Sequence, residues 1–176
     1  MRKIFVVYCL LALLTGLFYP ILVTGLADYF FPEKASGSFI YKNRWVGSKL
    51  IGQKFSKDSY FWPRPSAGEY NPLASGGSNL GPISLKLKAQ VEERKTKWGP
   101  HAPVELLYAS GSGLDPYITA PSAYFQAERV AKARHVDKEI VETLIRQGTV
   151  LPGFGFIGGP IVNVLELNLL LDEQLK

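Results

Sequence analysis

The stretch IFVVYCLLALLTGLFYPILVTGLA, residues 4–27, contains no charged side chain. As an α-helix rising about 1.5 Å per residue it would be about 36 Å long, enough to cross a hydrocarbon core of about 30 Å with some tilt. This length and unbroken apolar character decide the architecture, because such a segment is typical of a membrane-spanning helix. We therefore expect one transmembrane helix over residues 4–27.

The charges around this stretch predict its orientation. Arg2 and Lys3 precede it, and Asp28 follows it. Because Lys and Arg are retained on the cytoplasmic side of a span, we expect residues 1–3 in the cytoplasm. Residues 28–176 are then expected outside, as one extracytoplasmic domain.

A cleaved signal peptide is the alternative interpretation of the same segment. Gly25 and Ala27 would serve as the small residues before a cut after Ala27. The apolar run is longer than the roughly 7 to 15 residues of a signal peptide, so we favour a retained anchor. The aromatic run at 29–31 supports the anchor, since aromatic side chains gather at membrane interfaces.

Composition narrows the classes of function further. The chain has 176 residues, enough for one domain and an appendage. Its one cysteine, Cys9, lies in the apolar stretch, so we expect neither a disulfide nor a cysteine-rich metal site in the rest of the chain. The formal net charge is +5, with Lys and Arg interleaved with Asp and Glu. Such mixed charges are typical of a solvent-exposed surface without a basic patch. We therefore expect no nucleic acid partner.

The rest of the chain reads as a mixture of short strands and helices. We expect strands over residues 39–41, 45–47, 50–55 and 104–110, and an ordered proline-rich loop over 60–72. Helices are expected over residues 83–98, 122–134, 139–147 and 162–176, with caps at Thr119, Asp137 and Asn163 for the last three. The final segment is also compatible with a strand, but its polar side chains favour a helix. The predicted fold is a single N-terminal transmembrane helix plus one exported α/β (mixed α+β) domain, with a small sheet covered by three or four helices.

Catalytic motifs are not found in the sequence. Ser78 has Gly76 two residues before it but Leu80 two residues after it, so it is not the nucleophile of a G-x-S-x-G elbow. The two histidines, His101 and His135, are separated in sequence and expected at the surface. We therefore expect no catalytic residue and no metal site.

Gly153, Gly155 and Gly158 match the pattern G-x-G-x-x-G. This pattern indicates dinucleotide binding only inside a βαβ unit with an acidic residue about 20 residues further on. The chain ends before that distance is reached, so we interpret the segment as a loop.

Two glycine-serine turns resemble each other. They are SGGSNLGP at 75–82 and ASGSGLDP at 109–116. One interpretation is a phosphate cradle, because backbone N–H groups at the start of a helix favour an anion. Its candidate nucleotide-binding residues are Ser75, Gly76, Gly77, Ser78 and Asn79, the first three of which resemble the SGG of the ABC-ATPase signature. The favoured interpretation is structural: the glycines let the chain turn into the helices that follow.

Six blocks of sequence occur together and in order behind the predicted span. They are GSKLIGQKF (47–55), YFWPRPSA (60–67), ASGGSNLGP (74–82), ASGSGLDPYI (109–118), QAERVAKAR (126–134) and VNVLELNLLLD (162–172). This set resembles the KdpC family, the C subunits of the Kdp potassium-transporting ATPase of prokaryotes, over nearly the whole chain. The segment GFGFIGGP at 153–160 is less typical of that family.

The resemblance implies an accessory, non-catalytic subunit of an ATP-driven, high-affinity potassium uptake pump in the prokaryotic plasma (inner) membrane. The implied partners are the lipid bilayer, a channel-like potassium-binding subunit, a P-type ATPase subunit and a small accessory subunit. Two roles are implied: stabilising the assembly, and raising the ATP affinity of the pump subunit as a catalytic chaperone. ATP is scarce outside the cell, so we favour the assembly role and expect no cofactor on this chain, with ATP involved through the pump subunit.

A stand-alone function is the alternative. The chain would then be a membrane-anchored extracytoplasmic binding protein or hydrolase, which requires a ligand pocket or a nucleophile and base that meet. For the assembly role, the predicted partner-contact residues are Tyr60, Phe61, Arg64, Pro65, Ser110, Gly111, Ser112, Gly113 and Asp115. Aromatic residues and Arg often dominate protein interfaces. Equally, Tyr60 and Phe61 could be core residues and Arg64 a surface charge.

Overall fold

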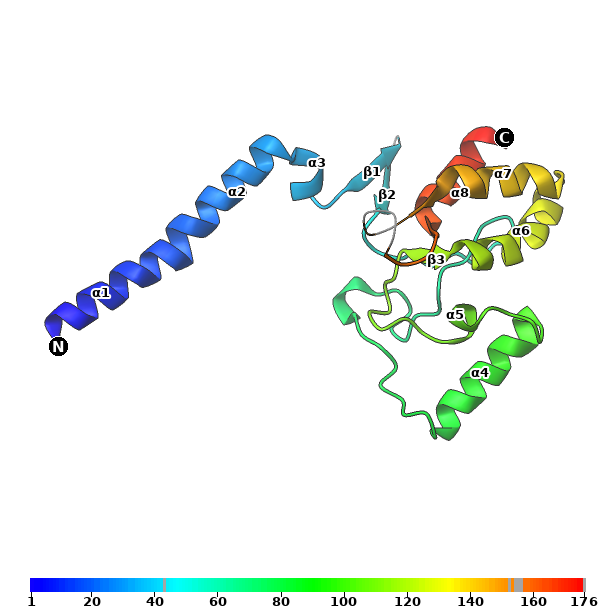
Figure 1. Cartoon of the computed structure of the whole chain (residues 1–176), viewed down its shortest axis with the longest axis horizontal. Coiled ribbons are helices and arrows are strands. Elements are labelled where there is room, and N and C mark those ends of the chain that lie inside the picture. The colour runs from blue at the N-terminus through cyan, green and yellow to red at the C-terminus, as the bar shows by residue number, and fades with distance from the viewer. Residues whose placement is uncertain (43, 152, 154–156, 176) are drawn as a thin grey trace. The chain divides into compact units, whose positions relative to one another are not determined.

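The computed structural model of the chain describes residues 1–176 except 43, 152, 154–156 and 176 (Figure 1). It divides into two compact units, Met1–Ser48 and Lys49–Lys176. The first unit holds the apolar helix and a hairpin, and the second holds the hydrophobic core.

The apolar stretch forms one continuous helix over Arg2–Phe30, long and apolar enough to cross a membrane. It consists of α1 (Arg2–Leu13), a π-helical turn (Leu14–Phe18) and α2 (Tyr19–Phe30). The π turn lies just before Pro20, which has no backbone N–H to donate to the preceding turn. The predicted span is confirmed as a helix of sufficient length, extended by a few residues at both ends.

A short helix and a hairpin complete the first unit. They are α3 (Pro32–Ala35), β1 (Phe39–Lys42) and β2 (Arg44–Ser48). The two strands pair antiparallel, with Phe39 opposite Ser48 and Tyr41 opposite Trp45, and the register shifts between Ile40 and Tyr41. The strands predicted at 39–41 and 45–47 are therefore confirmed.

The second unit is a small three-stranded sheet with helices around it. Its strands are β3 (Tyr117–Thr119), β4 (Thr149–Val150) and β5 (Ile161–Asn163). Its helices are the 3-10 turn η2 (Pro72–Ala74), α4 (Leu85–Trp98), α5 (Val104–Leu107), α6 (Ala120–Arg134), α7 (Lys138–Gly148) and α8 (Val164–Gln174). The strand order is β3-β5-β4, antiparallel throughout.

The core lies between the sheet and helices α6, α7 and α8. Its fully buried side chains include Ile118 of β3, Val162 of β5, Val130 of α6, Ile145 of α7 and Leu171 of α8. The expected small sheet covered by helices is thus confirmed, with the hairpin forming a second small sheet of its own in the other unit.

Local signals placed the helix ends well. The Thr119 hydroxyl accepts the Ser122 N–H at the start of α6, and the Asn163 side chain accepts the Glu166 N–H at the start of α8. Asp137 occupies the cap position of α7, although its side chain makes no capping hydrogen bond.

Two predicted strands are wrong. Residues 104–110 begin with the one-turn helix α5, in which the consecutive Leu106 and Leu107 are both buried. A strand would send these neighbours to opposite faces. Residues 50–55 form turns and irregular backbone. A Cβ on Gly52 would lie 2.6 Å from the Asp115 carbonyl oxygen, so this segment is shaped by close packing on a distant loop.

The last predicted helix is shorter than expected. Residues 161–163 form β5, and the helix begins only at Val164. Gly155 of the G-x-G-x-x-G pattern lies outside the described residues, so the interpretation of that segment stays a prediction.

Candidate functional site

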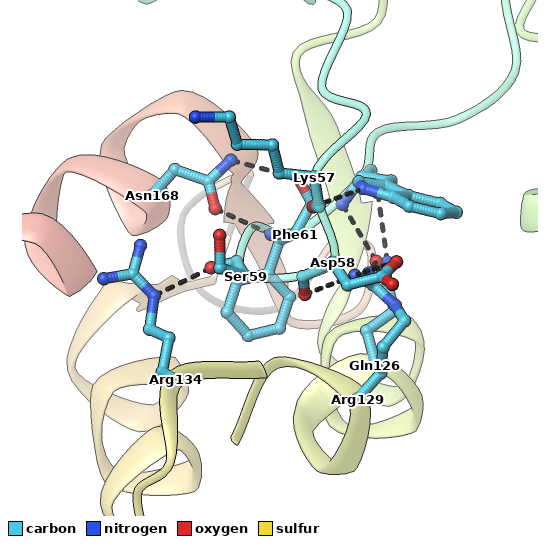
Figure 2. A network of polar contacts seen from close by, with 9 residues as sticks. Lys57, Asp58, Ser59, Phe61, Gln126, Arg129, Arg134 and Asn168 are labelled. Atoms are coloured by element: carbon cyan, nitrogen blue, oxygen red, sulfur yellow. Dashed lines mark hydrogen bonds and ion pairs between the residues drawn. The ribbon is translucent and has the colours of Figure 1, made fainter. Parts of the chain in front are cut away.

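The loop at residues 58–72 is held in place by two buried carboxamides (Figure 2). Asn168 of α8 accepts the Phe61 N–H at 2.8 Å and donates to the Phe61 carbonyl at 3.0 Å. Gln126 of α6 does the same for Trp62, at 2.9 and 3.0 Å. A carboxamide carries both a donor and an acceptor, so each side chain satisfies one residue's backbone completely.

This clamp places Phe61 in the core. Its side chain is 0% exposed, packed among the buried residues of the second unit. Phe61 was predicted as a partner contact, and the structure places it in its core alternative instead. Because the Phe61 ring is fixed in the core, the positions of the residues on either side of it in the loop are restricted as well.

Two arginines of α6 hold the residues before Phe61 (Figure 2). Arg134 donates to the Ser59 carbonyl at 2.7 Å and pairs with Asp172 at 2.7 Å. The Tyr60 hydroxyl donates to the other Asp172 oxygen at 2.9 Å. Burial, reinforced by the hydrogen bond to Asp172, raises the pKa of Tyr60. Tyr60 therefore links the loop to α8 through its hydroxyl.

The second arginine, Arg129, lies within a stack of rings. Its guanidinium centre is 4.2 Å from the Trp62 ring centroid, and the Lys97 ammonium lies 3.9 Å from the same centroid. Trp62 meets Trp98 edge-on at 5.1 Å. Arg129 donates to the Asp58 carbonyl at 2.6 Å and to Gln126 at 2.8 Å. Burial lowers the pKa of Arg129 to about 10, which leaves it charged at neutral pH.

The two glycine-serine turns contact each other directly. The Gly76 N–H and the Ser75 hydroxyl both donate to the Ser112 carbonyl, at 2.8 and 2.9 Å. A Cβ on Gly113 would lie 2.7 Å from the Gly76 carbonyl oxygen, and one on Gly77 would lie 3.2 Å from the Gly111 carbonyl oxygen. Residues about 35 positions apart therefore form one backbone-to-backbone contact. Glycine is needed at 113, where no Cβ fits, and a Cβ at 77 would be tight against the opposite backbone.

Helices follow both turns as expected, but neither turn forms the helix N-terminus itself. Helix α4 begins only at Leu85 and is capped by Ser84, well after the first turn. The second turn runs into strand β3, which begins at Tyr117. Residues 75–79 therefore lie before the helix start and not at it, and the Gly76 N–H already donates to the Ser112 carbonyl, while nucleotide binding by these residues stays a prediction.

The proline-rich loop packs on the second turn. Arg64 pairs with Asp115 at 3.1 Å, both side chains being 28% exposed. The Ser110 N–H donates to the Pro65 carbonyl at 3.0 Å, and the Tyr70 hydroxyl donates to the Arg64 carbonyl at 2.8 Å. Most predicted contact residues are thus brought together in one place.

We call this place the turn cluster, defined as Arg64, Pro65, Ser75–Gly77 and Ser110–Asp115. Within it, Ser75, Gly111 and Ser112 are exposed, while Ser110 and Gly113 are buried. Tyr60 and Phe61 lie apart from the turn cluster, where the loop packs against α6 and α8. The sequence did not single out Leu73, which is 95% exposed two residues before the first turn. The only sequence feature that could have indicated Leu73 as a contact residue is its apolar side chain beside a polar turn.

A cavity of about 700 Å³ lies between the loop and helix α4. Gly77 and Ser78 of the predicted nucleotide set line it, while Ser75, Gly76 and Asn79 do not. Its remaining lining includes the aromatic Trp62, Tyr70 and Trp98 and the basic Lys54, Lys86, Arg94 and Lys97. The sequence carried a signal for this: Lys86, Arg94 and Lys97 recur at helical spacing on α4.

The cations of this cavity are partly engaged by the protein itself. Lys54 pairs with Glu69, and Arg94 donates to the Leu107 carbonyl at 2.7 Å. Burial raises the pKa of Tyr70 to about 12. The cavity offers cations and ring faces to an anionic or aromatic group, together with the carboxylates of Glu69 and Glu93.

The histidines lie where the sequence predicted. His101 and His135 are both exposed. Within the described residues, no group of three or more His, Cys, Asp or Glu side chains is close enough to hold a metal ion.

Comparison with known proteins gives a consistent result. The family model of KdpC, described as the c chain of the K⁺-transporting ATPase, matches residues 1–173. The potassium-transporting ATPase KdpC subunit of Acidobacterium capsulatum is 48% identical over 169 residues, covering 93% of this chain and 92% of the relative. That of Pectobacterium atrosepticum is 48% identical over 184 residues, covering 99% and 96%. That of Leptospira interrogans is 46% identical over 179 residues, covering 94% and 89%.

Proposed function

Since this chain belongs to the KdpC family of K⁺-transporting ATPase c chains, we propose that it is a non-catalytic accessory subunit that stabilises assembly of the pump. Its partners are a channel-like potassium-binding subunit, a P-type ATPase subunit and a small accessory subunit. The N-terminus lies in the cytoplasm and Lys49–Lys176 lies outside. The observation that carries the proposal is the turn cluster. Its exposed residues Ser75, Gly111 and Ser112 are held in place by hydrogen bonds and an ion pair within the cluster.

Bracing matters because association costs free energy for every group that must be ordered. The two turns share hydrogen bonds to the Ser112 carbonyl, and the Arg64–Asp115 pair fixes the loop against them. A surface already fixed in the free subunit loses little conformational entropy on docking, so more of its contact energy appears as affinity.

Two substitutions test the docking role. No atom lies within 4 Å of a Cβ built on Gly111, and the residue is exposed, so we expect Gly111→Trp to add bulk at the surface. Arg64→Ala removes the ion pair that braces the loop. We expect both to lower the yield of complex when the full chain is co-purified with its partners from native membranes. Lys132→Trp, on the exposed side of α6, is the control and should co-purify normally.

The outcome also separates this proposal from the stand-alone alternative. Recovery of the unaltered chain as a monomer, without a channel-like or ATPase partner, would refute the assembly role. Normal co-purification of Gly111→Trp would move the docking surface elsewhere on the molecule.

A second role, raising the ATP affinity of the pump subunit, is favoured by one observation. The cavity beside Gly77 and Ser78 combines basic and aromatic side chains, the residue types that suit a nucleotide. Calorimetry of the detergent-solubilised full chain with ATP tests direct binding, with Gly77→Val as the variant. Micromolar binding that Gly77→Val abolishes would support this role, and no detectable heat would leave assembly alone.

A further inference from the structure

The hairpin of the first unit has an aromatic face. Tyr41 of β1 lies opposite Trp45 of β2, and Phe39 lies two residues before Tyr41 on the same face. Trp45 meets Phe39 edge-on at 5.7 Å and Tyr41 at 5.3 Å. The side chains of Phe39, Tyr41 and Trp45 are nevertheless 54%, 63% and 71% exposed.

Such a hairpin needs a surface to lie against. A two-stranded sheet is marginally stable in water by itself, and exposed aromatic patches mark binding surfaces. A shallow hollow of about 270 Å³ on the hairpin is lined by Phe39, Trp45, Val46 and Gly47. This lining of aromatic, apolar and glycine residues favours contact with an apolar surface.

Backbone hydrogen bonds order the short segment between the end of the apolar helix and the hairpin. The Phe31 N–H donates to the Ala27 carbonyl, and the Ala35 N–H donates to the Phe31 carbonyl, both at 2.8 Å. The Ser38 N–H then donates to the Glu33 carbonyl at 2.8 Å. At helical and extended rises per residue, Phe39 can lie no further than about 25 Å from the helix end.

The side chains near the helix end are those of a membrane interface. Tyr29, Phe30 and Phe31 are exposed there, and the Lys34 ammonium lies 5.8 Å from the Phe31 ring centroid. Residues 28–48 carry three basic and two acidic side chains, a net charge of +1. Trp, Tyr and basic side chains are the types that gather where a span leaves the bilayer, since they have an apolar body and a polar end.

We propose that the face formed by Phe39, Tyr41 and Trp45 lies in the lipid headgroup layer beside the end of the span. The hairpin then acts as a second, shallow membrane contact that fixes how the chain leaves the bilayer. The lipid surface is favoured over a partner protein because the face follows the aromatic run at residues 29–31 after a short segment of chain, close to where the span ends. This inference depends on the span but not on its orientation or on the assembly role.

Tryptophan fluorescence of the full chain in vesicles tests the proposal. The probe is phosphatidylcholine brominated near the headgroup end of its acyl chains, which quenches only rings lying at that depth. We expect quenching of the unaltered protein to fall at least about threefold in Trp45→Phe, because Trp45 is the tryptophan at the interface. Trp62→Phe is the matched control and should keep the quenching, since Trp62 belongs to the other unit.

Aqueous iodide supplies the opposing measurement. If the tryptophan emission lost in Trp45→Phe is quenched by iodide and not by brominated lipid, the face lies in water and the proposal is wrong. Protection of Trp45 from iodide only after the other pump subunits are added would also overturn it, by assigning the face to a protein partner. Trp45→Phe keeps an aromatic ring in the hairpin, so loss of folding does not complicate the comparison.

Discussion

The backbone groups of Phe61 and Trp62 hydrogen-bond to side-chain carboxamides instead of to a neighbouring strand. A buried N–H or carbonyl without a partner costs about 1 to 3 kcal/mol, so an irregular loop can enter a core only if such partners exist. Asn168 and Gln126 supply them from two different helices. Phe61 can therefore be fully buried although it belongs to a loop rich in prolines.

Asn168→Ala should consequently destabilise the second unit strongly. It removes two hydrogen bonds and leaves both backbone groups of Phe61 unpaired, so we expect a loss of about 2 to 4 kcal/mol in the free energy of unfolding. Urea unfolding of the full chain in detergent, followed by tryptophan fluorescence, measures it. Gln174→Ala, at the exposed end of the same helix, is the control. A loss no larger than that of the control would show that the clamp contributes nothing.

Tyr70 predicts a stability change at alkaline pH. Burial raises its pKa from 10.0 to about 12 in the folded chain. The unfolded chain therefore releases the phenol proton first, so this contribution is complete below pH 10 and is lost as pH rises through about 12. The total is about 2 to 3 kcal/mol, which is two pKa units. We expect Tyr70→Phe to reduce the slope of unfolding free energy against pH in that range.

Tyr117→Phe serves as the comparison for that experiment. It also deletes one phenol hydroxyl, from a side chain of β3 that lies outside the loop of Tyr70. An unchanged slope in Tyr70→Phe, or the same reduction in both variants, would contradict the prediction.

At the scale of elements, the two glycine-serine turns form the joint between the loop, helix α4 and strand β3. Each turn has little regular structure of its own. They are fixed by each other, through the Ser112 carbonyl and the close approach of Gly113 to Gly76. The similarity of their sequences follows from this shared need for small residues.

Gly111 and Gly113 make a matched pair for testing the joint. Gly113 has a φ of 68°, and its Cβ would lie 2.7 Å from a backbone oxygen. Gly111 has open space around its Cβ position. We expect Gly113→Ala to cost about 2 to 4 kcal/mol in thermal or urea unfolding and Gly111→Ala under about 1 kcal/mol. Equal effects would mean that the turns move apart without cost.

The sequence predicted the elements whose signals are local. The caps at Thr119 and Asn163 depend on residues three positions away, and both were confirmed. The strands predicted at 50–55 and 104–110 were wrong, because Gly52 and Leu106 are placed by residues far along the chain. For the same reason the sequence shows the similarity of the two turns but not their mutual contact.

For the candidate site, the sequence named most residues of the turn cluster but not their arrangement. Arg64 and Asp115 are both predicted contact residues, yet their ion pair spans 51 positions and leaves no local pattern. Phe61 was chosen as an aromatic contact, and its burial depends on Asn168 more than 100 residues away. The spacing of Lys86, Arg94 and Lys97 indicates a basic face on α4, but only the structure shows that this face lines a cavity.

At the scale of the whole molecule, anchoring and folding are separate tasks. The apolar helix and hairpin belong to Met1–Ser48, whereas the hydrophobic core runs from Phe61 to Leu171. Among the described residues, no side chain of that core comes from the first unit. Deleting residues 1–27 therefore removes most of the apolar helix without removing core residues.

This separation predicts how a chain without residues 1–27 behaves. Residues 28–176 should form a soluble, folded protein whose unfolding midpoint in urea matches that of the full chain. Assembly should weaken at least about tenfold, because the tether no longer holds the docking surface at high effective concentration near its partners. The measurement is titration of the truncated chain into membranes containing the other pump subunits, with potassium-stimulated ATP hydrolysis as the readout. The full chain at equal expression is the control. Full activity of the truncated chain at stoichiometric concentration would show that the anchor is dispensable, and that the turn cluster alone has enough affinity to hold the complex together.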